Sequence, residues 1–352
     1  MILITQVSLK YHSIFPNRTH NLMSKKILVA GGGGFIGGHL AKTLVNRGHE
    51  VRVVDVKPLD QWYQKIEGAE NIVANLEEKE ACYSASEGCD EVYNLACNMG
   101  GMGFIENNKA LCMLSILINT HLLMAAKEFN IKKYLYSSSA CVYAADKQTE
   151  TEIIALKESD AYPAMPEDGY GWEKLFSERM CKHFEEDFGM QVRVVRFHNV
   201  YGPDGTWRGG REKAPAALCR KIIEAKKSGD LTIEVWGDGE QTRSFMYIDD
   251  CITGLDKLME SDFSDPINLG RSEMVSINGL IDIISEIAGV TVERNHDLNA
   301  PQGVRGRNSD NTLILDKLGW EPEVDLKTGL AKTYAWIEEQ IEREARGESV
   351  IS

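Results

Sequence analysis

Four side chains within residues 137–174 could together carry acid/base chemistry. Ser139 and Cys141 follow an apolar run, and Tyr170 and Lys174 lie four apart at the start of an amphipathic segment. Residues four apart share one face of a helix, so the Lys174 ammonium is expected beside the Tyr170 phenol. A neighbouring positive charge lowers the pKa of a tyrosine. Tyr170 is therefore a candidate proton acceptor for an alcohol that is oxidised to a ketone.

A tyrosine and a lysine at this spacing also recur by chance, usually as a surface pair, so the interpretation depends on the elements upstream. Residues 27–30 predict a short strand, and the apolar side chains of 35–45 recur at helical spacing. Between them, Gly31-x2-Gly34-x2-Gly37, or the register that begins at Gly32, lets the backbone approach a pyrophosphate at a helix N-terminus.

A second predicted strand, 51–54, ends in Asp55, about twenty residues past the glycine turn. A carboxylate there accepts hydrogen bonds from a ribose diol and repels a 2′-phosphate. The order of strand, turn, helix, strand and acid predicts a dinucleotide site for NAD rather than NADP. The alternative is a glycine-rich loop in an unrelated α/β protein.

The alternation of strands and helices continues, with strands expected at 91–96, 133–136 and 192–196 and helices at 111–129 and 170–188. This pattern predicts an α/β fold with a Rossmann-type doubly wound parallel sheet. The strand at 133–136 would deliver Ser139 and Cys141 to the carboxyl edge, where such sheets bind ligands.

Beyond Pro203 the composition changes to loops rich in Gly, Arg and Lys, which suggest a diphosphate site in an otherwise acidic protein. Solvated surface charge explains any single one of these cations equally well. Ser276 is expected to cap a helix, and 325–346 to form the last helix. We expect a nucleotide-binding domain at 25–203, a smaller C-terminal α/β substrate-binding subdomain at 204–346 with some segments returning to the sheet, and a tail at 347–352. Residues 1–24 are expected to be a disordered extension or a start assigned too early.

Composition excludes other classes of protein. The chain has 352 residues, a net charge of −14, 43% apolar and 26% charged residues. The acidic balance argues against nucleic acid as a partner, and no run reaches the roughly eighteen apolar residues of a membrane span. The eight cysteines form no Cys-x2-Cys pair and no metal spacing, so free thiols in a reducing cytoplasm are expected, with no metal.

Five motifs resemble the GDP-mannose 3,5-epimerases of the extended short-chain dehydrogenase/reductase family, over about residues 25–341. They are Met99-Gly100-Gly101-Met102-Gly103, Ser138-Ser139-Ala140-Cys141, the loop that carries Lys213, Trp236 to Phe245, and Val304 to Asn311. Three positions depart from the family pattern. Ala30 stands where Thr is common, Asn75 where an adenine-contacting Asp is usual, and Asn98 where Asp is frequent.

The resemblance implies NAD-dependent epimerisation of GDP-mannose, or a related nucleotide sugar, at C3 and C5 through a 4-keto intermediate. The product would be GDP-L-galactose, with GDP-L-gulose as a second possible product, and the protein would be a homodimer formed through helices 111–129 and 170–188. The implied catalytic residues are Ser139, Tyr170 and Lys174 for hydride chemistry, with Cys141 and Lys213 as the epimerising acid/base pair. The implied cofactor residues are Gly31, Gly34, Phe35, Ile36, Gly37, Asp55, Asn75, Tyr170 and Lys174. The implied substrate residues are Gly100, Met102, Gly103, Asn199, Lys213, Lys221, Gln241, Arg243, Arg305 and Arg307.

The chemistry agrees with this assignment. A sugar C–H is too weak an acid for a side chain, whereas a ketone at C4 acidifies the hydrogens at both C3 and C5. Two alternatives remain: a 4-epimerase or dehydratase on the same scaffold, which the thiol at 141 disfavours, and a non-catalytic NAD sensor, which would usually have lost Tyr170 or Lys174. His198 is interpreted as a structural residue.

Overall fold

The short apolar runs of the N-terminal half form one parallel sheet, as predicted. The computed structural model describes residues 24–352, so the expected extension lies outside the described residues except for Ser24. The strand order is β11-β6-β5-β4-β1-β2-β3, and all neighbours run parallel. The strands are β1 (Lys26–Ala30), β2 (Glu50–Asp55), β3 (Glu70–Val73), β4 (Glu91–Asn94), β5 (Lys133–Ser139), β6 (Gln191–Phe197) and β11 (Ile267–Leu269).

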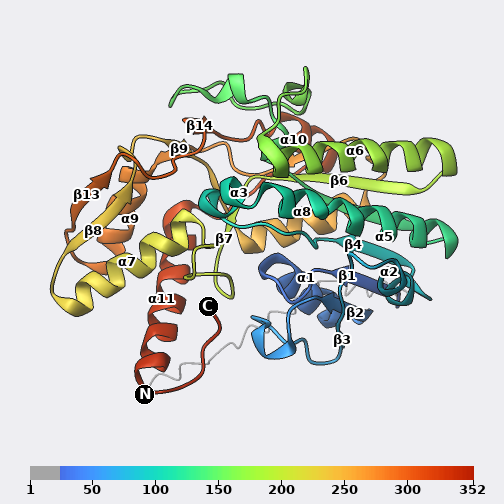
Figure 1. Cartoon of the computed structure of the whole chain (residues 1–352), viewed down its shortest axis with the longest axis horizontal. Helices are drawn as coiled ribbons and strands as arrows, with labels where there is room; N and C mark the ends of the chain where they lie inside the picture. The colour runs from blue at the N-terminus through green and yellow to red at the C-terminus, as the bar shows by residue number, and fades with distance from the viewer. Residues whose placement is uncertain (1–23) are drawn as a thin grey trace, which may run out of the picture.

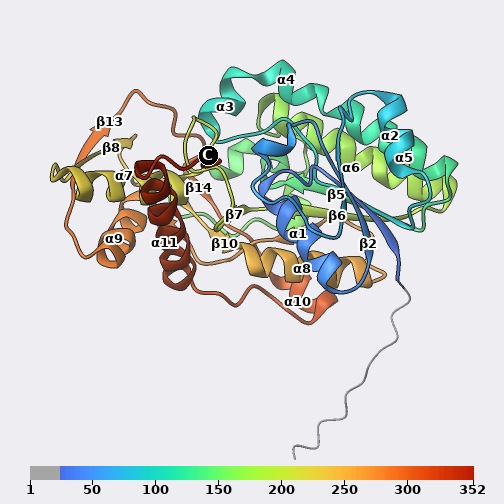
Figure 2. The ribbon, with the colours of Figure 1, turned by 90° about the horizontal axis from the view of Figure 1, so that it is seen from below.

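Helices cover both faces of this sheet, which confirms the doubly wound prediction (Figures 1 and 2). One face carries α1 (Phe35–Asn46) and α8 (Ile248–Glu260), and the other carries α2 (Lys79–Ser86), α4 (Lys109–Leu114), α5 (Ile116–Glu128) and α6 (Asp168–Phe188). The strands are apolar on both sides because both faces are buried. The order reverses between β1 and β4, so a ligand crevice is expected at their carboxyl ends.

The helix expected at 111–129 begins earlier and is divided in two at Ser115. The buried Ser115 hydroxyl accepts a hydrogen bond from the Asn98 backbone N–H at 2.9 Å, which ties this junction to the loop after β4. The stretch Lys109–Glu128 is long and apolar enough to cross a membrane by length and composition, with 44% of its most apolar window buried. In the fold α5 packs against α2 and α6.

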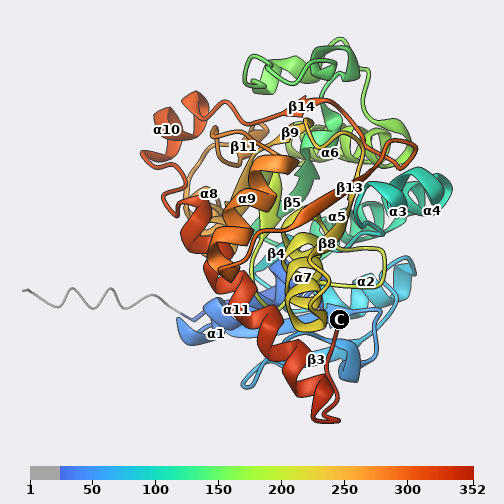
Figure 3. The same cartoon turned by 90° about the vertical axis from the view of Figure 1, so that its left-hand side faces the viewer.

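The C-terminal half builds a second lobe beside the carboxyl edge of the large sheet (Figures 1 and 3). In it, α11 packs on α7 and α9, and the Ser276 hydroxyl caps α9 by accepting from the Gly279 N–H at 3.0 Å, as predicted. Its helices are α7 (Ala214–Ser228), α9 (Ile277–Ala288) and α11 (Leu326–Ala345), with strands β8 (Thr232–Trp236) and β13 (Glu293–Asp297).

Short elements join the two lobes. They are β7 (Asn199–Tyr201) with β10 (Phe245–Tyr247), the small sheet β12 (Val275–Ser276), β9 (Thr242–Arg243) and β14 (Gly306–Arg307), and helices α3 (Met102–Asn107) and α10 (Thr312–Leu318). After β10 the chain returns through α8 to β11 in the large sheet. One apolar cluster runs from Leu135 in β5 to Ile223 in α7, so the lobes share a core.

The segment after α11 folds back onto the first lobe. The buried Trp207 indole donates to the Ile351 carbonyl at 3.0 Å, and the Tyr63 hydroxyl donates to the Ser352 carbonyl at 3.2 Å. Val350 packs against the shared core. Residues 350–352 therefore cross from the second lobe to the nucleotide-binding lobe.

A buried ion pair fixes α6 to the sheet, and its loss is predicted to be costly. Arg196 in β6 donates to both carboxylate oxygens of Glu178 in α6 at 2.8 and 2.7 Å, with both side chains at most 3% exposed. Glu178→Gln should lower the free energy of unfolding in urea titrations by about 3–5 kcal/mol, because it leaves a buried guanidinium without a counter-charge. Glu339→Gln, which breaks a solvent-exposed pair with Arg346, is the control and should change stability little. Equal losses in the two variants would contradict this role.

Candidate active site

A cavity of about 850 Å³ opens at the carboxyl edge of the sheet, where the strand order reverses. The turn after β1 is close-packed: Gly31 has a φ of +82°, and a Cβ on Gly37 would lie 2.3 Å from the Gly31 carbonyl oxygen. Only glycine leaves this space, and the N-terminus of α1 faces the cavity behind it. The lining includes the predicted residues Gly31, Gly34, Phe35, Ile36, Gly37, Asp55, Asn75, Gly100, Ser139, Tyr170 and Lys213.

Asp55 lies at the end of β2 on the wall of this cavity. It is 8% exposed, and its Oδ1 accepts a hydrogen bond from the Lys57 backbone N–H at 3.0 Å. The Lys57 ammonium donates to the Gly33 carbonyl at 2.8 Å and lies 5.0 Å from the centre of the Tyr63 ring. Lys57 was not identified from the sequence, although a cation two residues after the acid was a usable signal. The glycine turn, the helix N-terminus and the acid fit NAD.

The strand β5 delivers Ser139, and the 3-10 turn Ala140–Val142 that follows holds Cys141. The Cys141 N–H donates to the Ser139 hydroxyl at 3.2 Å. Helix α6 lies directly against this turn: the Glu167 N–H donates to the Cys141 carbonyl at 2.9 Å, and a Cβ on Gly171 would lie 2.4 Å from the same oxygen. The structure therefore brings Ser139, Cys141 and Tyr170 together, as the sequence predicts.

The pKa of Tyr170 differs from expectation. Burial raises it well above its ordinary value, and the neighbouring Cys97 and Cys141 raise it further. The Lys174 ammonium lies 5.5 Å from the centre of the Tyr170 ring but 3.5 Å from the Glu173 carboxylate. The predicted net lowering of the tyrosine pKa is therefore wrong, because burial outweighs the effect of the Lys174 ammonium, and Cys97, Cys141 and Glu173 add to the rise.

Glu173 is a site residue that sequence reasoning missed. Its Oε1 accepts hydrogen bonds from the Tyr136 hydroxyl at 3.0 Å and the Ser177 hydroxyl at 2.9 Å. Burial works to lower the pKa of Lys174, yet Cys97 and Glu173 raise it overall, so this lysine is protonated. No spacing in the sequence distinguishes Glu173 from a surface acid on α6.

Burial shifts both Cys141 and Lys213 toward their neutral forms. Burial raises the pKa of Cys141 to about 11, the Glu167 carboxylate raises it, and Arg307 lowers it. Burial lowers the pKa of Lys213, which precedes α7, whereas the Cys141 thiolate form would raise it. Starting from the two neutral forms, transfer of one proton from the thiol to the amine gives a base and an acid without any change in the number of bound protons.

Of Arg305 and Arg307, only Arg307 reaches the thiol. Its side chain is buried, and its Nη1 lies 3.6 Å from the Cys141 sulfur. Arg243 is its neighbour across the β9–β14 pair, where burial and the Arg307 charge lower the Arg243 pKa to about 10. Arg305 is instead paired with Asp238 at 3.0 Å on the surface.

The remaining predicted substrate residues lie in several places. Met102 and Gly103 begin α3 beside Gly303 and Trp236. Asn199 donates to the Ser244 carbonyl at 3.1 Å, and the buried Gln241 donates to the Trp236 carbonyl at 3.0 Å. Lys221 donates to the Glu234 carbonyl at 2.8 Å and does not line the cavity.

Three other lining or neighbouring residues complete the site. His198 is buried and lines the cavity; burial lowers its pKa to about 3, and its Nε2 lies 3.1 Å from Asn268 Oδ1. The structure adds Cys97, on the cavity wall beside Tyr170, and Gln148, whose Oε1 accepts from Arg307 Nε at 2.6 Å. All eight cysteines are free thiols, and within residues 24–352 no cluster of acids, cysteines and histidines could hold a metal ion.

Comparison with known proteins agrees with this geometry. The sequence profile of the NAD dependent epimerase/dehydratase family matches residues 27–270. The chain belongs to this family. It is 48% identical over 327 residues to GDP-mannose 3,5-epimerase of Arabidopsis thaliana, covering 92% of this chain and 85% of the relative. It is 49% identical over 320 residues to GDP-mannose 3,5-epimerase 1 of Oryza sativa subsp. japonica, and the match covers 91% of this chain and 83% of the relative.

Solved structures of the same family share the fold. The UDP-glucose 4-epimerase of Thermotoga maritima, solved with UDP-glucose, superposes with a TM-score of 0.80 at 25% identity, covering 90% of this chain and 99% of the other. The UDP-glucuronic acid 4-epimerase of Bacillus cereus, solved with UDP-glucuronic acid and NAD, superposes with a TM-score of 0.75 at 26% identity, covering 89% of this chain and 99% of the other. NAD is therefore the cofactor of this family member.

Asp55 is predicted to determine the choice of cofactor. Asp55→Ala should weaken NAD binding and reduce the difference in affinity between NAD and NADP, because it removes both a hydrogen-bond acceptor for the ribose and a charge that repels the 2′-phosphate. Isothermal titration calorimetry with each cofactor measures the effect. Asp60→Ala, which changes an exposed acid outside the cavity lining, is the control. Wild-type protein that binds NADP as tightly as NAD would show that Asp55 has no such role.

Proposed function

We propose that the protein inverts C3 and C5 of GDP-mannose through a 4-keto intermediate, giving GDP-L-galactose. The observation that carries this proposal is one catalytic centre that holds two sets of side chains. Ser139 and Tyr170 form a redox set, and Cys141 beside Arg307, with Lys213 on the cavity wall, forms an acid/base set. The likeness to GDP-mannose 3,5-epimerases supports the choice of sugar nucleotide. A plain 4-epimerisation would need only the redox set.

The redox set prepares the sugar. The chemistry that NAD supplies when bound is removal of a hydride from C4 and its return to C4 at the end. Tyr170 first gives its phenol proton to solvent in the open cavity, and the phenolate then accepts the C4 hydroxyl proton as the hydride leaves; its high pKa makes it a strong acceptor. Ser139 donates to the same oxygen, and the protonated Lys174 beside the ring stabilises the phenolate as it forms.

The acid/base set then inverts the carbons next to the ketone. Proton transfer from the Cys141 thiol to the Lys213 amine gives a thiolate, which removes a proton from carbon, and an ammonium, which returns one from the opposite face. The S–H bond re-forms as the C–H bond breaks, and the N–H bond breaks as the new C–H bond forms. The same pair acts at C5 and at C3 because both carbons are adjacent to C4.

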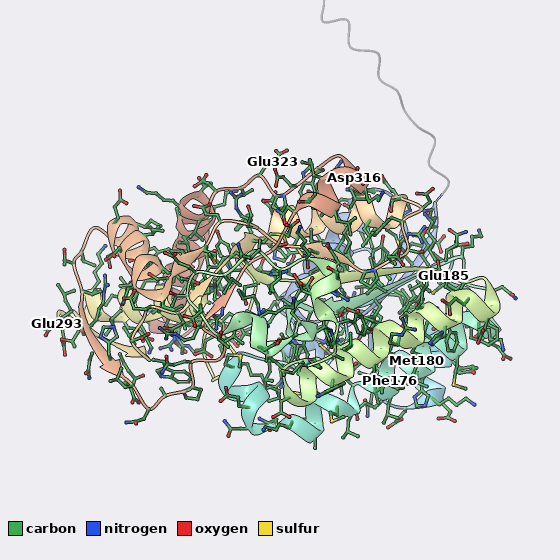
Figure 4. The ribbon with its side chains drawn as sticks, turned by 90° about the horizontal axis from the view of Figure 1, so that it is seen from above. Phe176, Met180, Glu185, Glu293, Asp316 and Glu323 are labelled. Atoms are coloured by element: carbon green, nitrogen blue, oxygen red, sulfur yellow. The ribbon has the colours of Figure 1, made fainter. Side chains whose placement is uncertain are left out.

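A homodimer and a cytoplasmic location complete the proposal. Large apolar side chains are exposed on α4, α5 and α6, among them Leu114, Leu117, Trp172 and Phe176, the last at 53% exposure. Phe176 and Met180 lie one turn apart on the outer side of α6, next to α5 (Figure 4). An apolar face of this kind in a folded chain favours an interface, and a second copy buries it symmetrically. The location stays a prediction from the free thiols.

The proposed mechanism predicts that loss of the redox group and loss of the acid/base group stop the reaction at different steps. Tyr170→Phe should abolish all steps, since no carbon is acidic without the ketone. Cys141→Ala should still form the 4-keto sugar, seen as near-ultraviolet absorbance of reduced nicotinamide, but should lose roughly 10²–10⁴-fold in inversion. NMR of sugar recovered from D₂O should find deuterium at C3 and C5 only with wild type. Full deuterium uptake and product from Cys141→Ala would falsify the acid/base assignment.

The dimer proposal has its own test. Phe176→Asp should convert the dimer into monomers in sedimentation velocity, because a charge would be buried in an apolar interface. Leu315→Asp, at a similarly exposed leucine on α10, should leave the assembly unchanged. Monomeric wild type at micromolar concentration would end the proposal.

A further inference from the structure

Glu167 lies next to the catalytic thiol, at the N-terminus of the helix that carries Tyr170. Its carboxylate is paired with Arg307, and its backbone N–H donates to the Cys141 carbonyl at 2.9 Å. The side chains of Glu167 and Arg307 are 12% and 8% exposed. The Arg307 guanidinium in turn lies 3.6 Å from the Cys141 sulfur and donates to Gln148 at 2.6 Å. A buried carboxylate thus shares one arginine with the thiol.

One carboxylate oxygen of Glu167 is not used by this pairing. Its Oε2 is buried and has no hydrogen-bond partner among the described residues. A buried carboxylate oxygen normally has a partner, because leaving it without one costs free energy. The Cys141 thiol interacts with this carboxylate, since Glu167 raises the pKa of Cys141 and a thiol–carboxylate hydrogen bond contributes to the rise.

Other charges around the thiol do not replace Glu167. The groups that contact Cys141 or interact with its charge come from β5, α6, β9, β14 and the residue before α7: Ser139, Tyr170, Arg243, Arg307 and Lys213. Among them, Arg307 lowers the pKa of Cys141, and Glu167 is the carboxylate that raises it. Without Glu167, the Arg307 charge beside the thiol would not be opposed by this carboxylate.

We propose that Glu167 is a positioning residue for Cys141: by neutralising Arg307 it keeps the thiolate, once formed, a strong proton acceptor at the sugar carbon. A base that is stabilised by unopposed positive charge is present in larger amount but removes protons less well, since base strength follows the affinity for the proton. Glu167 therefore lowers the fraction of Cys141 that is present as thiolate and makes the thiolate that does form a stronger base. This inference rests on the proposed acid/base role of Cys141.

The first experiment measures the thiol in protein without sugar nucleotide, so it does not depend on the proposed function. Iodoacetamide alkylation of the peptide that contains Cys141 is followed by mass spectrometry across pH. The pH at which the alkylation rate is half its maximum is the midpoint for Cys141. Glu167→Gln should move this midpoint down by roughly 1–3 pH units, because it removes a neighbouring negative charge. At a pH below both midpoints, alkylation should be about tenfold faster for every pH unit that separates the two midpoints. Arg307→Gln should move the midpoint in the opposite direction.

Two controls separate this effect from loss of structure. Glu167→Asp keeps the charge and should stay near the wild-type midpoint. Asp256→Asn removes a carboxylate that is 8% exposed and paired with Arg47 at 2.6 Å, and should leave the Cys141 midpoint unchanged. If Glu167→Gln does not fold, the direction in which Arg307→Gln moves the Cys141 midpoint decides whether the charge of the Glu167–Arg307 pair acts on the thiol. An unchanged midpoint in a folded Glu167→Gln, or no slowing in Arg307→Gln, overturns the proposal.

A second experiment connects the thiol to turnover. With GDP-mannose in D₂O, Glu167→Gln should still give the absorbance of reduced nicotinamide but should incorporate deuterium at C3 and C5 at least tenfold more slowly. Its pH–rate profile should rise at lower pH than that of wild type. Deuterium incorporation at the wild-type rate would overturn the role of Glu167, whereas wild-type protein without any action on GDP-mannose would overturn only the proposed function.

Discussion

The close packing between helix α6 and the turn after β5 determines the geometry of the site. The Cys141 carbonyl accepts the Glu167 N–H at 2.9 Å, and only a glycine at 171 lets the helix approach this oxygen. Tyr170 therefore has a fixed position relative to Ser139 and Cys141, all three on elements tied to the sheet. The Glu178–Arg196 pair holds the next turns of α6 against β6. Redox and acid/base groups are thus parts of one rigid junction.

Burial is the second constraint, and it acts on every titratable group of this junction. It raises the pKa values of Tyr170 and Cys141 and lowers that of Lys213, so it shifts all three groups toward their neutral forms. Each group is a strong acid or base only after a proton has moved to a neighbour. In a buried site, such transfers between paired side chains are less costly than the formation of isolated charges.

The sequence predicted the parts that depend on local pattern. The glycine turn, Asp55 and the alternation of strands and helices have clear periodicity, and the parallel sheet and the meeting of Ser139, Cys141 and Tyr170 follow from them. Glu167 and Glu173 were missed because their roles depend on burial and on partners from other elements. The predicted direction of the Tyr170 pKa shift was wrong for the same reason, since spacing places Lys174 on the correct face but does not reveal how deeply the phenol is buried.

The segment at residues 350–352 has a consequence for handling the protein. Trp207 and Tyr63 hold its carbonyls, and Ser352 lies on the wall of the cofactor cavity. Any polypeptide that continues past residue 352, whether native or fused, must leave from the rim of that cavity. An affinity tag or fluorescent reporter at this end would share space with the path of the dinucleotide, whereas an attachment before Ser24 starts at the opposite edge of the sheet, where Lys25 and Lys26 bond to residues at the start of β4.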